Sequence, residues 1–314
     1  MEKSSEEEYG VNKEKFKQDL YANLGKENVF IDEPMSKHTT FKIGGPAEFY
    51  LVPRTFDQVA YIKKLSVQEG IGLRVIGYGS DLLISDAGLR GIVMQIADNL
   101  SAVSVAGNYL SAQAGASNKK VADSAAAAGL AGYEFASGIP GGIGGAAIMN
   151  AGAYDGEFAQ VAESLKCLNS DGEVVTVSRE DAKWGYRQSM MNDAGMLVLE
   201  ARLKLLTDDR FEIYKRMKDL EERRASKQPL EMPSAGSTFK RPEGHYAGKL
   251  IQDSGMQGYQ VGGAQVSLKH AGFVVNTGHA TASDVRQLIA DVQDRVYEFS
   301  GVRLEPEVRY WGDE

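Results

Sequence analysis

The stretch from Gly138 to Gly145 constrains this chain more than any other, because it places five glycines within eight residues. Each glycine loses conformational entropy when the chain folds, so a loop that only connects two elements seldom needs so many. Without a Cβ, successive N–H groups can turn toward one anion and approach it closely. The stretch is therefore predicted to hold a phosphate-bearing ligand against the backbone.

A second and shorter glycine stretch, Gly77-Tyr78-Gly79-Ser80, follows the apolar run LRVI. Taken alone, it could equally be an ordinary turn after a strand. Neither stretch has the GxxxxGK[ST] spacing of a P-loop, and GYGSDL lacks the third glycine and the helix of the dinucleotide fingerprint. Asp86-Ala87-Gly88 breaks the chain where that helix should start. A P-loop hydrolase and a Rossmann dehydrogenase are disfavoured, which leaves a pyrophosphate-containing cofactor held by a different fold.

Helical periodicity recurs along the chain. It predicts helices over 12–24, from the cap Thr55 to Gly70, over 118–128 and over the highly charged residues 208–228. A last helix, capped by Ser283 and ended by Gly301, is expected to pack on a sheet. Its apolar stripe consists of Val285, Leu288, Ile289, Val292, Val296 and Phe299.

Short strands fill most of the remaining sequence. The pattern predicts a strand, a tight turn and another strand over 35–53, a buried strand at LRVIG, and three short strands between 91 and 115. A hairpin is expected at Asp171-Gly172, with a further strand over 195–206. Strands and helices do not alternate strictly, so the fold class is α+β. The predicted divisions are 1–24, 25–207 with a subdivision near 90, and 208–314.

Composition narrows the classes of function. The formal net charge of −8 argues against a general nucleic-acid binder. The single cysteine, Cys167, cannot form an intrachain disulfide, and the four histidines lack zinc-ligand spacing, so no metal is expected. The N-terminus is charged and is predicted to be a frayed tail. No run of about 18 apolar residues occurs in the sequence. A cytoplasmic protein that does not span a membrane is expected.

Eight segments, in order, resemble the UDP-N-acetylenolpyruvoylglucosamine reductases of peptidoglycan synthesis, over nearly the whole chain after the tail. They are HTTFKIGGPA (38–47), GYGSDLL (77–83), SGIPGGIGGAAIMNAGAY (137–154), GYRQS (185–189), SAGSTFKRP (234–242), AGKLI (247–251), GGAQVSLKHAGFVVN (262–276) and LEPEVRYWG (304–312). The resemblance implies an FAD-binding fold of the vanillyl-alcohol-oxidase (PCMH) type over 25–207 and an α/β substrate-binding domain over 208–314. It also implies NADPH as the reductant and UDP-N-acetylglucosamine enolpyruvate as the substrate.

The resemblance further implies which residues lie near the pyrophosphate and flavin of FAD. They are Gly77, Gly79, Ser80, Gly138, Gly141, Gly144 and Gly145. Asp81 stands where the family usually has asparagine, and a carboxylate near a pyrophosphate repels it, so this side chain is expected to point away or to accept from a backbone N–H. Cys167 lies in a strand-like segment and neither glycine stretch contains histidine, so FAD is expected to be noncovalent.

For catalysis, the resemblance assigns the proton donor to Ser237, the electrostatic anchor of the substrate carboxylate to Arg187, and a hydrogen bond from a protonated carboxyl group to Glu307. Pattern alone would read all three as turn or surface residues. Alternation places Val302, Leu304, Val308 and Tyr310 on one face of a strand and Arg303, Glu305, Glu307 and Arg309 on the other, with Pro306 at an edge or terminus. The resemblance also implies that the UDP-sugar is contacted by Tyr186, Lys240, Gln265 and Asn276.

Several alternatives stay open on the sequence. Another FAD-dependent oxidase or dehydrogenase of the same fold would act on an alcohol or sugar without needing Ser237 and Glu307. A non-catalytic nucleotide-binding module would use the glycine loops without turnover. His270 is expected to be structural rather than catalytic. Because little sequence separates Arg187 from Ser237, the chain is expected to be the form of the family that lacks a tyrosine-bearing lid.

Overall fold

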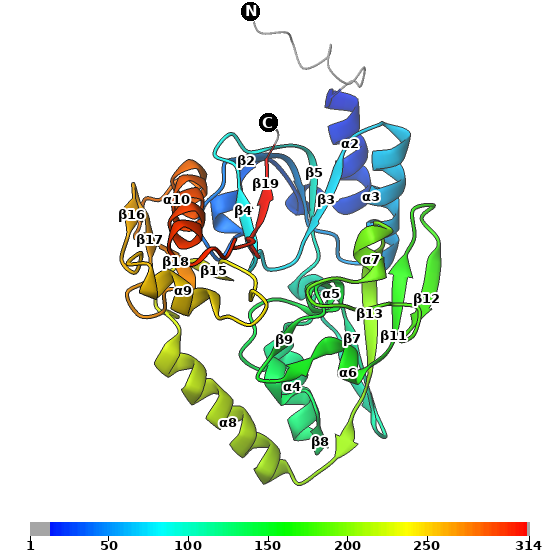
Figure 1. Cartoon of the computed structure of the whole chain (residues 1–314). Helices are drawn as coiled ribbons and strands as arrows, with labels where there is room; N and C mark the ends of the chain where they lie inside the picture. The colour runs from blue at the N-terminus through cyan, green and yellow to red at the C-terminus, as the bar shows by residue number, and fades with distance from the viewer. Residues whose placement is uncertain (1–12, 313–314) are drawn as a thin grey trace, which may run out of the picture. The chain divides into compact units, whose positions relative to one another are not determined.

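A computed structural model describes residues 13–312 and divides the chain into two compact units (Figure 1). Unit 1 comprises the chain up to Ile31 together with 49–78 and 91–222, and unit 2 comprises 32–48, 79–90 and the chain from Arg223. The predicted first helix is present as α2 (Lys13–Leu24), while Asn12 and the predicted tail lie outside the described residues. Each unit has its own apolar core.

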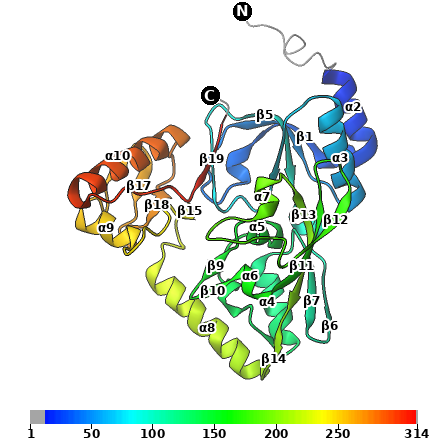
Figure 2. The same cartoon turned by 45° about the vertical axis from the view of Figure 1, so that its right-hand side comes forward.

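A five-stranded antiparallel sheet forms the centre of unit 1, as Figure 2 shows. Its strand order is β12-β11-β13-β7-β6. The strands are β6 (Val103–Ala106), β7 (Tyr109–Gln113), β11 (Ala162–Leu168), β12 (Val174–Ser178) and β13 (Leu197–Lys204). The predicted hairpin between β11 and β12 is confirmed, with Gly172 in the left-handed region at φ 81°.

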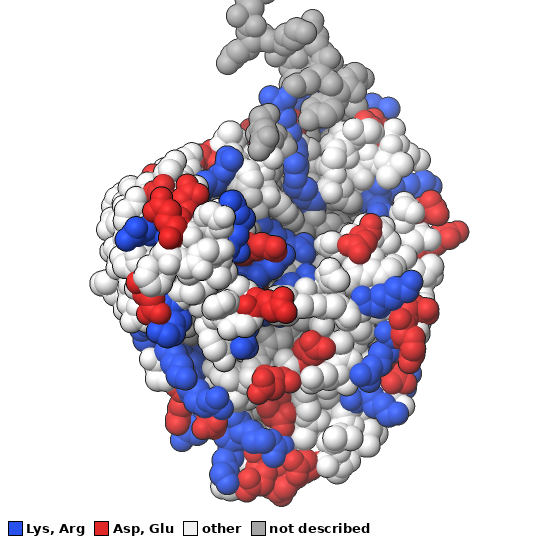
Figure 3. Space-filling model, in the orientation of Figure 1, with Lys and Arg blue, Asp and Glu red and all other residues white. Residues whose placement is uncertain are grey.

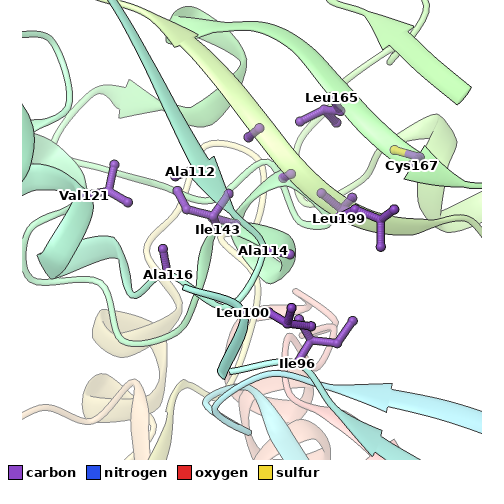
Figure 4. Close-up of a cluster of buried hydrophobic side chains, with 14 of the residues drawn as sticks. Ile96, Leu100, Ala112, Ala114, Ala116, Val121, Ile143, Leu165, Cys167 and Leu199 are labelled. Atoms are coloured by element: carbon purple, nitrogen blue, oxygen red, sulfur yellow. The ribbon is translucent and has the colours of Figure 1, made fainter. Parts of the chain in front are cut away.

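Helices of unit 1 begin where the sequence supplies caps. Thr55 caps α3 (Phe56–Gln68) through its side-chain oxygen, and Ser117 caps α4 (Asn118–Ala127) in the same way. The short helix α5 (Ile143–Ile148) contributes Ile143, which Figure 4 shows beside Ala112 and Ala114. These alanines leave room for the glycine-rich helix to approach the sheet closely.

A four-stranded sheet of order β1-β2-β5-β3 includes residues of both units. It consists of β1 (Val29–Pro34), β2 (Pro46–Leu51), β3 (Leu73–Ile76) and β5 (Leu89–Gln95), and β3 pairs with β5 in parallel. The strand predicted at the start of 35–53 is wrong, because Met35–Lys37 is a 3₁₀ turn and 38–45 is irregular. The Thr39 hydroxyl donates to the carbonyl of Ile43 at 2.9 Å, which satisfies the backbone locally instead of in a ladder.

Unit 2 is built on a sheet of order β15-β18-β17-β16 with two helices beside it. These elements are β15 (Ser234–Ser237), β16 (Gln260–Val261), β17 (Ala264–Val266), β18 (Phe273–Asn276), α9 (Ala247–Asp253) and α10 (Ala282–Ser300). A parallel pair, β4 (Leu82–Ile84) and β19 (Arg309–Trp311), completes the unit. The strand predicted over 302–310 therefore forms only at its end, after Pro306.

Helix α10 packs on the sheet as predicted, but two details of that prediction are wrong. The N-cap is Thr281 rather than Ser283, because Thr281 and Asp284 exchange side-chain and backbone hydrogen bonds of 3.0 Å in a capping box. Phe299 is 53% exposed and does not belong to the core stripe. Val285, Leu288, Val292 and Val296 are fully buried, and Ile289 is partly buried.

The charged helix predicted over 208–228 is α8 (Arg210–Lys227), whose first residues belong to unit 1 and last to unit 2. Figure 3 shows side chains of both charge signs on the face where α8 lies in Figure 1. No helix within 13–312 is long and apolar enough to cross a membrane. Other short strands and α-helices are β8 (Leu130–Ala131), β9 (Gly152–Ala153), β10 (Gly156–Glu157), β14 (Leu206–Thr207), α6 (Phe158–Val161) and α7 (Met190–Asp193).

Candidate active site

The glycine segment, residues 138–145, is fixed in unit 1 by backbone hydrogen bonds to the chain that follows β7. The N–H of Ile143 donates to the carbonyl of Ala116 at 2.9 Å, and the N–H of Gly144 donates to the carbonyl of Ala114 at 2.8 Å. A Cβ added to Gly144 would lie 3.0 Å from the Cβ of Ala114. Gly144 is thus needed for close packing, and its N–H is not available to a ligand.

Other glycines of the segment have the features of an anion site. Within residues 13–312, no acceptor is found for the N–H groups of Gly141, Gly142 and Gly145. A Cβ added to Gly145 would meet nothing within 4 Å. An N–H without an acceptor in this part of the chain is a place where a ligand oxygen can bind. These groups fit the pyrophosphate of FAD, which lacks donors and needs several N–H partners.

The GYGS segment, residues 77–80, contains glycines of two kinds. A Cβ on Gly77 would approach only the carbonyl of Ile96, at 3.8 Å, so the space in front of it is open. Gly79, in unit 2, has φ 62°, and a Cβ there would collide with the carbonyl of His38. Packing alone therefore accounts for Gly79, whereas Gly77 leaves room for a cofactor.

Tyr78 adds a contact that the sequence pattern did not indicate. Its hydroxyl donates to the Asp98 carboxylate at 2.7 Å and lies 2.9 Å from the carbonyl of Gly115, and its ring would be 3.3 Å from a Cβ on Gly142. Burial and the neighbouring Asp98 carboxylate raise the pKa of Tyr78 above its ordinary value. The ring therefore stays neutral and packs against the glycine segment.

Arg187 lies at a tight turn of unit 1 between Gly185 and Gln188, whose N–H donates back to Gly185 at 3.4 Å. It is left-handed, at φ 58°, a conformation that a non-glycine residue adopts at some cost. Its guanidinium carbon lies 4.9 Å from the ring centroid of Tyr186, and its Nη2 donates to the carbonyl of Gly152 at 3.4 Å. Arg187, one of the predicted pair Tyr186-Arg187, thus contacts the chain that follows the glycine segment.

Buried Asn150 connects this turn to the end of α5. Its Nδ2 donates to the carbonyl of Gly185 at 3.1 Å, and its Oδ1 accepts from the N–H of Ala159 at 2.9 Å. Asn150, Tyr154 and Asp155 are also left-handed, at φ 43°, 51° and 65°. Backbone conformations of this kind cluster at functional sites, where the surrounding structure holds them. Sequence patterning did not indicate Asn150, because its role depends on tertiary contacts.

Ser237 and Glu307 lie on neighbouring segments of unit 2. The N–H of Glu307 donates to the carbonyl of Thr238 at 2.8 Å, and Phe239 pairs with Pro306 in an antiparallel bridge. Ser237 is exposed at the end of β15, after a register irregularity that includes Gly236 at φ 80°. In unit 2, Glu307 is therefore hydrogen-bonded through its backbone to Thr238, the residue that follows Ser237.

The predicted sugar-nucleotide contacts of unit 2 differ in their surroundings. Lys240 Nζ lies 3.1 Å from Glu305 Oε2, so its charge is already paired. Gln265 is half-buried on β17. Asn276 is buried, donates to the carbonyl of Phe41 at 3.1 Å and accepts from the N–H groups of Gly278 and Ala280. The Asn276 amide thus has a structural role in the fold.

His270, Asp81 and Cys167 also have defined surroundings. Nδ1 of His270 accepts from the N–H of Gly272 at 3.1 Å, as expected of a structural histidine. Burial raises the pKa of Asp81, and the charge of Arg309, 3.9 Å away, acts in the opposite direction. Cys167 is buried in β11, and burial raises the pKa of its thiol to about 12, which makes it a poor nucleophile. Within 13–312 there is no cluster of three metal-ligating side chains.

Comparison with known proteins places these features in one family. Residues 228–311 match the C-terminal domain of UDP-N-acetylenolpyruvoylglucosamine reductase, and residues 47–178 match an FAD binding domain. The chain is 51% identical over 286 residues to UDP-N-acetylenolpyruvoylglucosamine reductase of Alkaliphilus oremlandii, covering 91% of this chain and 94% of that protein. It is 48% identical over 291 residues to the enzyme of that name from Clostridium botulinum, covering 93% and 95%.

A solved structure agrees with this assignment. The crystal structure of UDP-N-acetylenolpyruvylglucosamine reductase from Thermus caldophilus matches with a TM-score of 0.79 at 34% identity, over 89% of this chain and 97% of that one. The expected α+β architecture, an FAD-binding fold of the PCMH type followed by the reductase C-terminal domain, is confirmed. The chain therefore belongs to the UDP-N-acetylenolpyruvoylglucosamine reductases, a family of flavin-dependent oxidoreductases.

Proposed function

We propose that this chain reduces UDP-N-acetylglucosamine enolpyruvate to UDP-N-acetylmuramate in peptidoglycan synthesis, with FAD as its cofactor and NADPH as the reductant. The observation that carries this proposal is the combination, in one chain, of an FAD binding domain with a reductase C-terminal domain. The N–H groups of Gly141, Gly142 and Gly145, which have no acceptor among the residues that the structure describes, support the cofactor. The segment pair that carries Ser237 and Glu307 supports the reaction.

When bound, FAD would supply the hydride chemistry of the reaction, between NADPH and the methylene carbon of the enolpyruvyl group. The adjacent carbon then needs a proton, and the developing negative charge spreads onto the substrate carboxylate. Ser237 donates the proton in this proposal. A hydroxyl is a weak acid, so it must be held in place to act as a proton donor. Ser237 lies at the end of β15, and the backbone bridge between Phe239 and Pro306 fixes the chain just after it.

Arg187 and Glu307 stabilise the charged intermediate in this proposal. Arg187 supplies a fixed positive charge toward the substrate carboxylate, and Glu307 donates a hydrogen bond from its carboxyl group. The left-handed backbone at Arg187 supports a role beyond packing, because such conformations persist at functional sites. Tyr186, Lys240, Gln265 and Asn276 remain the proposed contacts to the UDP-sugar, with Lys240 sharing its charge with Glu305.

The proposed domain organisation assigns 25–207 to FAD and 208–314 to the substrate. Between Arg187 and Ser237 the structure has only α7, β13, β14 and α8 as regular elements in this fully described stretch, which supports the form of the enzyme without a lid. We assign the enzyme to the cytoplasm, where its nucleotide-linked substrate and NADPH are available.

The test is a two-step flavin experiment on the purified protein. A yellow protein is expected, whose flavin absorbance bleaches when NADPH is added without air and returns when UDP-N-acetylglucosamine enolpyruvate is added. Bleaching by an alcohol or sugar, with no recovery on the enolpyruvyl substrate, would indicate an oxidase or dehydrogenase of the same fold. A colourless protein that takes up no FAD would contradict the proposed function.

A further inference from the structure

Asn118 connects α4 to the glycine segment through two hydrogen bonds. It is the first residue of α4 and only 2% exposed. Its backbone N–H donates to the carbonyl of Gly141 at 3.0 Å, and its Nδ2 donates to the carbonyl of Ile139 at 3.3 Å. The N–H groups of a first helical turn have no partner inside the helix, so this one is free to hold a neighbouring segment.

Tyr133 and the carbonyl of Ile139 together hold the Asn118 amide in one orientation. Its hydroxyl donates to Oδ1 of Asn118 at 2.8 Å, and the tyrosine is 1% exposed. Turning the amide over would place Oδ1 against the carbonyl oxygen of Ile139, where two acceptors repel each other. The pair of buried side chains thus keeps Nδ2 directed at Ile139.

The backbone bond to Gly141 determines the direction of an N–H group on the ligand side, and the side-chain bond to Ile139 holds the chain just before it. In a trans peptide the carbonyl and the following N–H point in opposite directions. Because the carbonyl of Gly141 points at the backbone N–H of Asn118, the N–H of Gly142 points away from α4. That N–H has no acceptor within residues 13–312. The contact with Asn118 therefore presents a buried donor to whatever occupies the glycine segment.

We propose that Asn118 and Tyr133 are positioning residues for the cofactor, which turn the Gly142 N–H toward the pyrophosphate of FAD by holding the carbonyls of Ile139 and Gly141. The inference rests on the proposed function for the identity of the ligand. It adds a determinant of FAD affinity that lies outside the glycine segment, in two buried side chains.

The test compares three variants of the full chain stripped of flavin. Asn118→Ala keeps the backbone bond to Gly141 but removes the side-chain bond to Ile139, so it tests whether that second contact is needed to fix the peptide that carries the Gly142 N–H. Tyr133→Phe leaves Oδ1 of Asn118 without its donor. The matched control is Asn28→Ala, because Asn28 is equally buried in unit 1, donates to the carbonyl of Leu24 at 2.7 Å and accepts from Arg54 at 2.9 Å. The measurements are thermal unfolding of each apoprotein and the dissociation constants of FAD, ADP and adenosine.

Asn118→Ala is expected to raise the dissociation constants of FAD and ADP by about tenfold, and Tyr133→Phe by about threefold, as loss of a buried hydrogen bond predicts. Adenosine, which lacks the pyrophosphate, is expected to be unaffected. Asn28→Ala is expected to lower the unfolding temperature similarly with no change in affinity. If Asn118→Ala does not fold, Tyr133→Phe decides the question by the same measurements.

Two results would overturn the proposal. One is an Asn118→Ala variant that weakens FAD binding no more than Asn28→Ala does. The other is a variant that weakens FAD but not ADP, because the pyrophosphate would then not be the group affected. Wild-type protein that binds neither FAD nor ADP would instead contradict the proposed function, so the two failures are distinguishable.

Discussion

The backbone N–H of Glu307 donates to the carbonyl of Thr238 at 2.8 Å, so the segment that carries Glu307 is tied to the strand end that carries Ser237. Both partners in this hydrogen bond are backbone atoms. Substitution of either the Ser237 or the Glu307 side chain therefore leaves the bond in place. Effects of such substitutions on turnover can be read as chemistry rather than as displacement of the segment.

Ser237→Ala is expected to leave the reduction of FAD by NADPH nearly unchanged and to slow reoxidation by the enolpyruvyl substrate by roughly 10²–10⁴-fold, the usual contribution of a positioned acid. Stopped-flow absorbance of the flavin measures the two steps separately. Ser234→Ala, on the same strand, is the matched control and should slow neither step. Equal loss in both steps would show that Ser237 is not the proton donor.

Glu307→Gln is expected to retain more activity than Glu307→Ala, because a glutamine side chain can donate the hydrogen bond that the proposed role of Glu307 requires. A loss of about tenfold for Gln and of about 10²–10³-fold for Ala in kcat is the expected pattern. The measurement is steady-state turnover with saturating NADPH. If Gln and Ala lost activity equally, donation by Glu307 would not be its contribution.

Arg187→Gly is expected to abolish turnover without destabilising the protein. Glycine relieves the left-handed backbone at φ 58°, worth about 1–2 kcal/mol, which offsets the greater entropy of the unfolded glycine chain and the lost contact with Tyr186. Arg187→Ala removes the same side chain but keeps the strain, so it should be less stable than the glycine variant by about 1 kcal/mol. Urea unfolding measures both. A glycine variant less stable than the alanine variant would contradict this account.

Local sequence patterns predicted the elements whose signals are local. Thr55 marks the start of α3 because its side chain bonds the first turn, and Gly172 marks the hairpin because it adopts a positive φ. The strand expected after Met35 failed because the Thr39 hydroxyl bonds nearby backbone, which no propensity anticipates. The cap of α10 was placed two residues late because Thr281 and Ser283 are both good caps, and only the contacts of Asp284 choose between them.

The sequence indicated a candidate site where a residue type has few other uses, and its members stay predictions. Five glycines in eight residues indicated a ligand, and family resemblance then supplied Ser237, Arg187 and Glu307. Asn118 and Tyr133 were not predicted, because an asparagine at a helix start and a tyrosine after a glycine are common in any fold. Their role becomes visible only in the folded chain, where these residues, fifteen positions apart, form a buried hydrogen bond.

Denaturation of the enzyme with acid is expected to release all of its FAD. Cys167 is buried in β11 with the pKa of its thiol raised to about 12, so at pH 8 only roughly one thiol in 10⁴ is the reactive thiolate. The measurement is flavin absorbance in the supernatant and the pellet. Cys167→Ala is the control and should bind as much FAD as wild type. Flavin that stays with precipitated wild-type protein but not with this variant would show a covalent link.

Protonation of His270 is expected to lower the free energy of unfolding as the pH falls below about 6.5, the ordinary pKa of histidine. Burial lowers the pKa of His270 in the folded protein below the unfolded value of 6.5, and Lys227 acts in the same direction. The unfolded chain therefore binds the proton more readily, so this contribution to stability is complete above about pH 6.5 and is lost as the pH falls toward the folded pKa. Protonation also removes the acceptor at Nδ1 for the N–H of Gly272.

His270→Asn tests this account, because an asparagine oxygen can accept from an N–H two residues later but does not titrate. The free energy of unfolding by urea, measured from pH 5 to 8, should depend less on pH in His270→Asn than in wild type, and the difference should appear below pH 6.5. His245→Asn changes an exposed histidine of the same unit and should leave the wild-type profile unchanged. If the His270→Asn profile fell as steeply as that of wild type, another group would be responsible for the loss of stability.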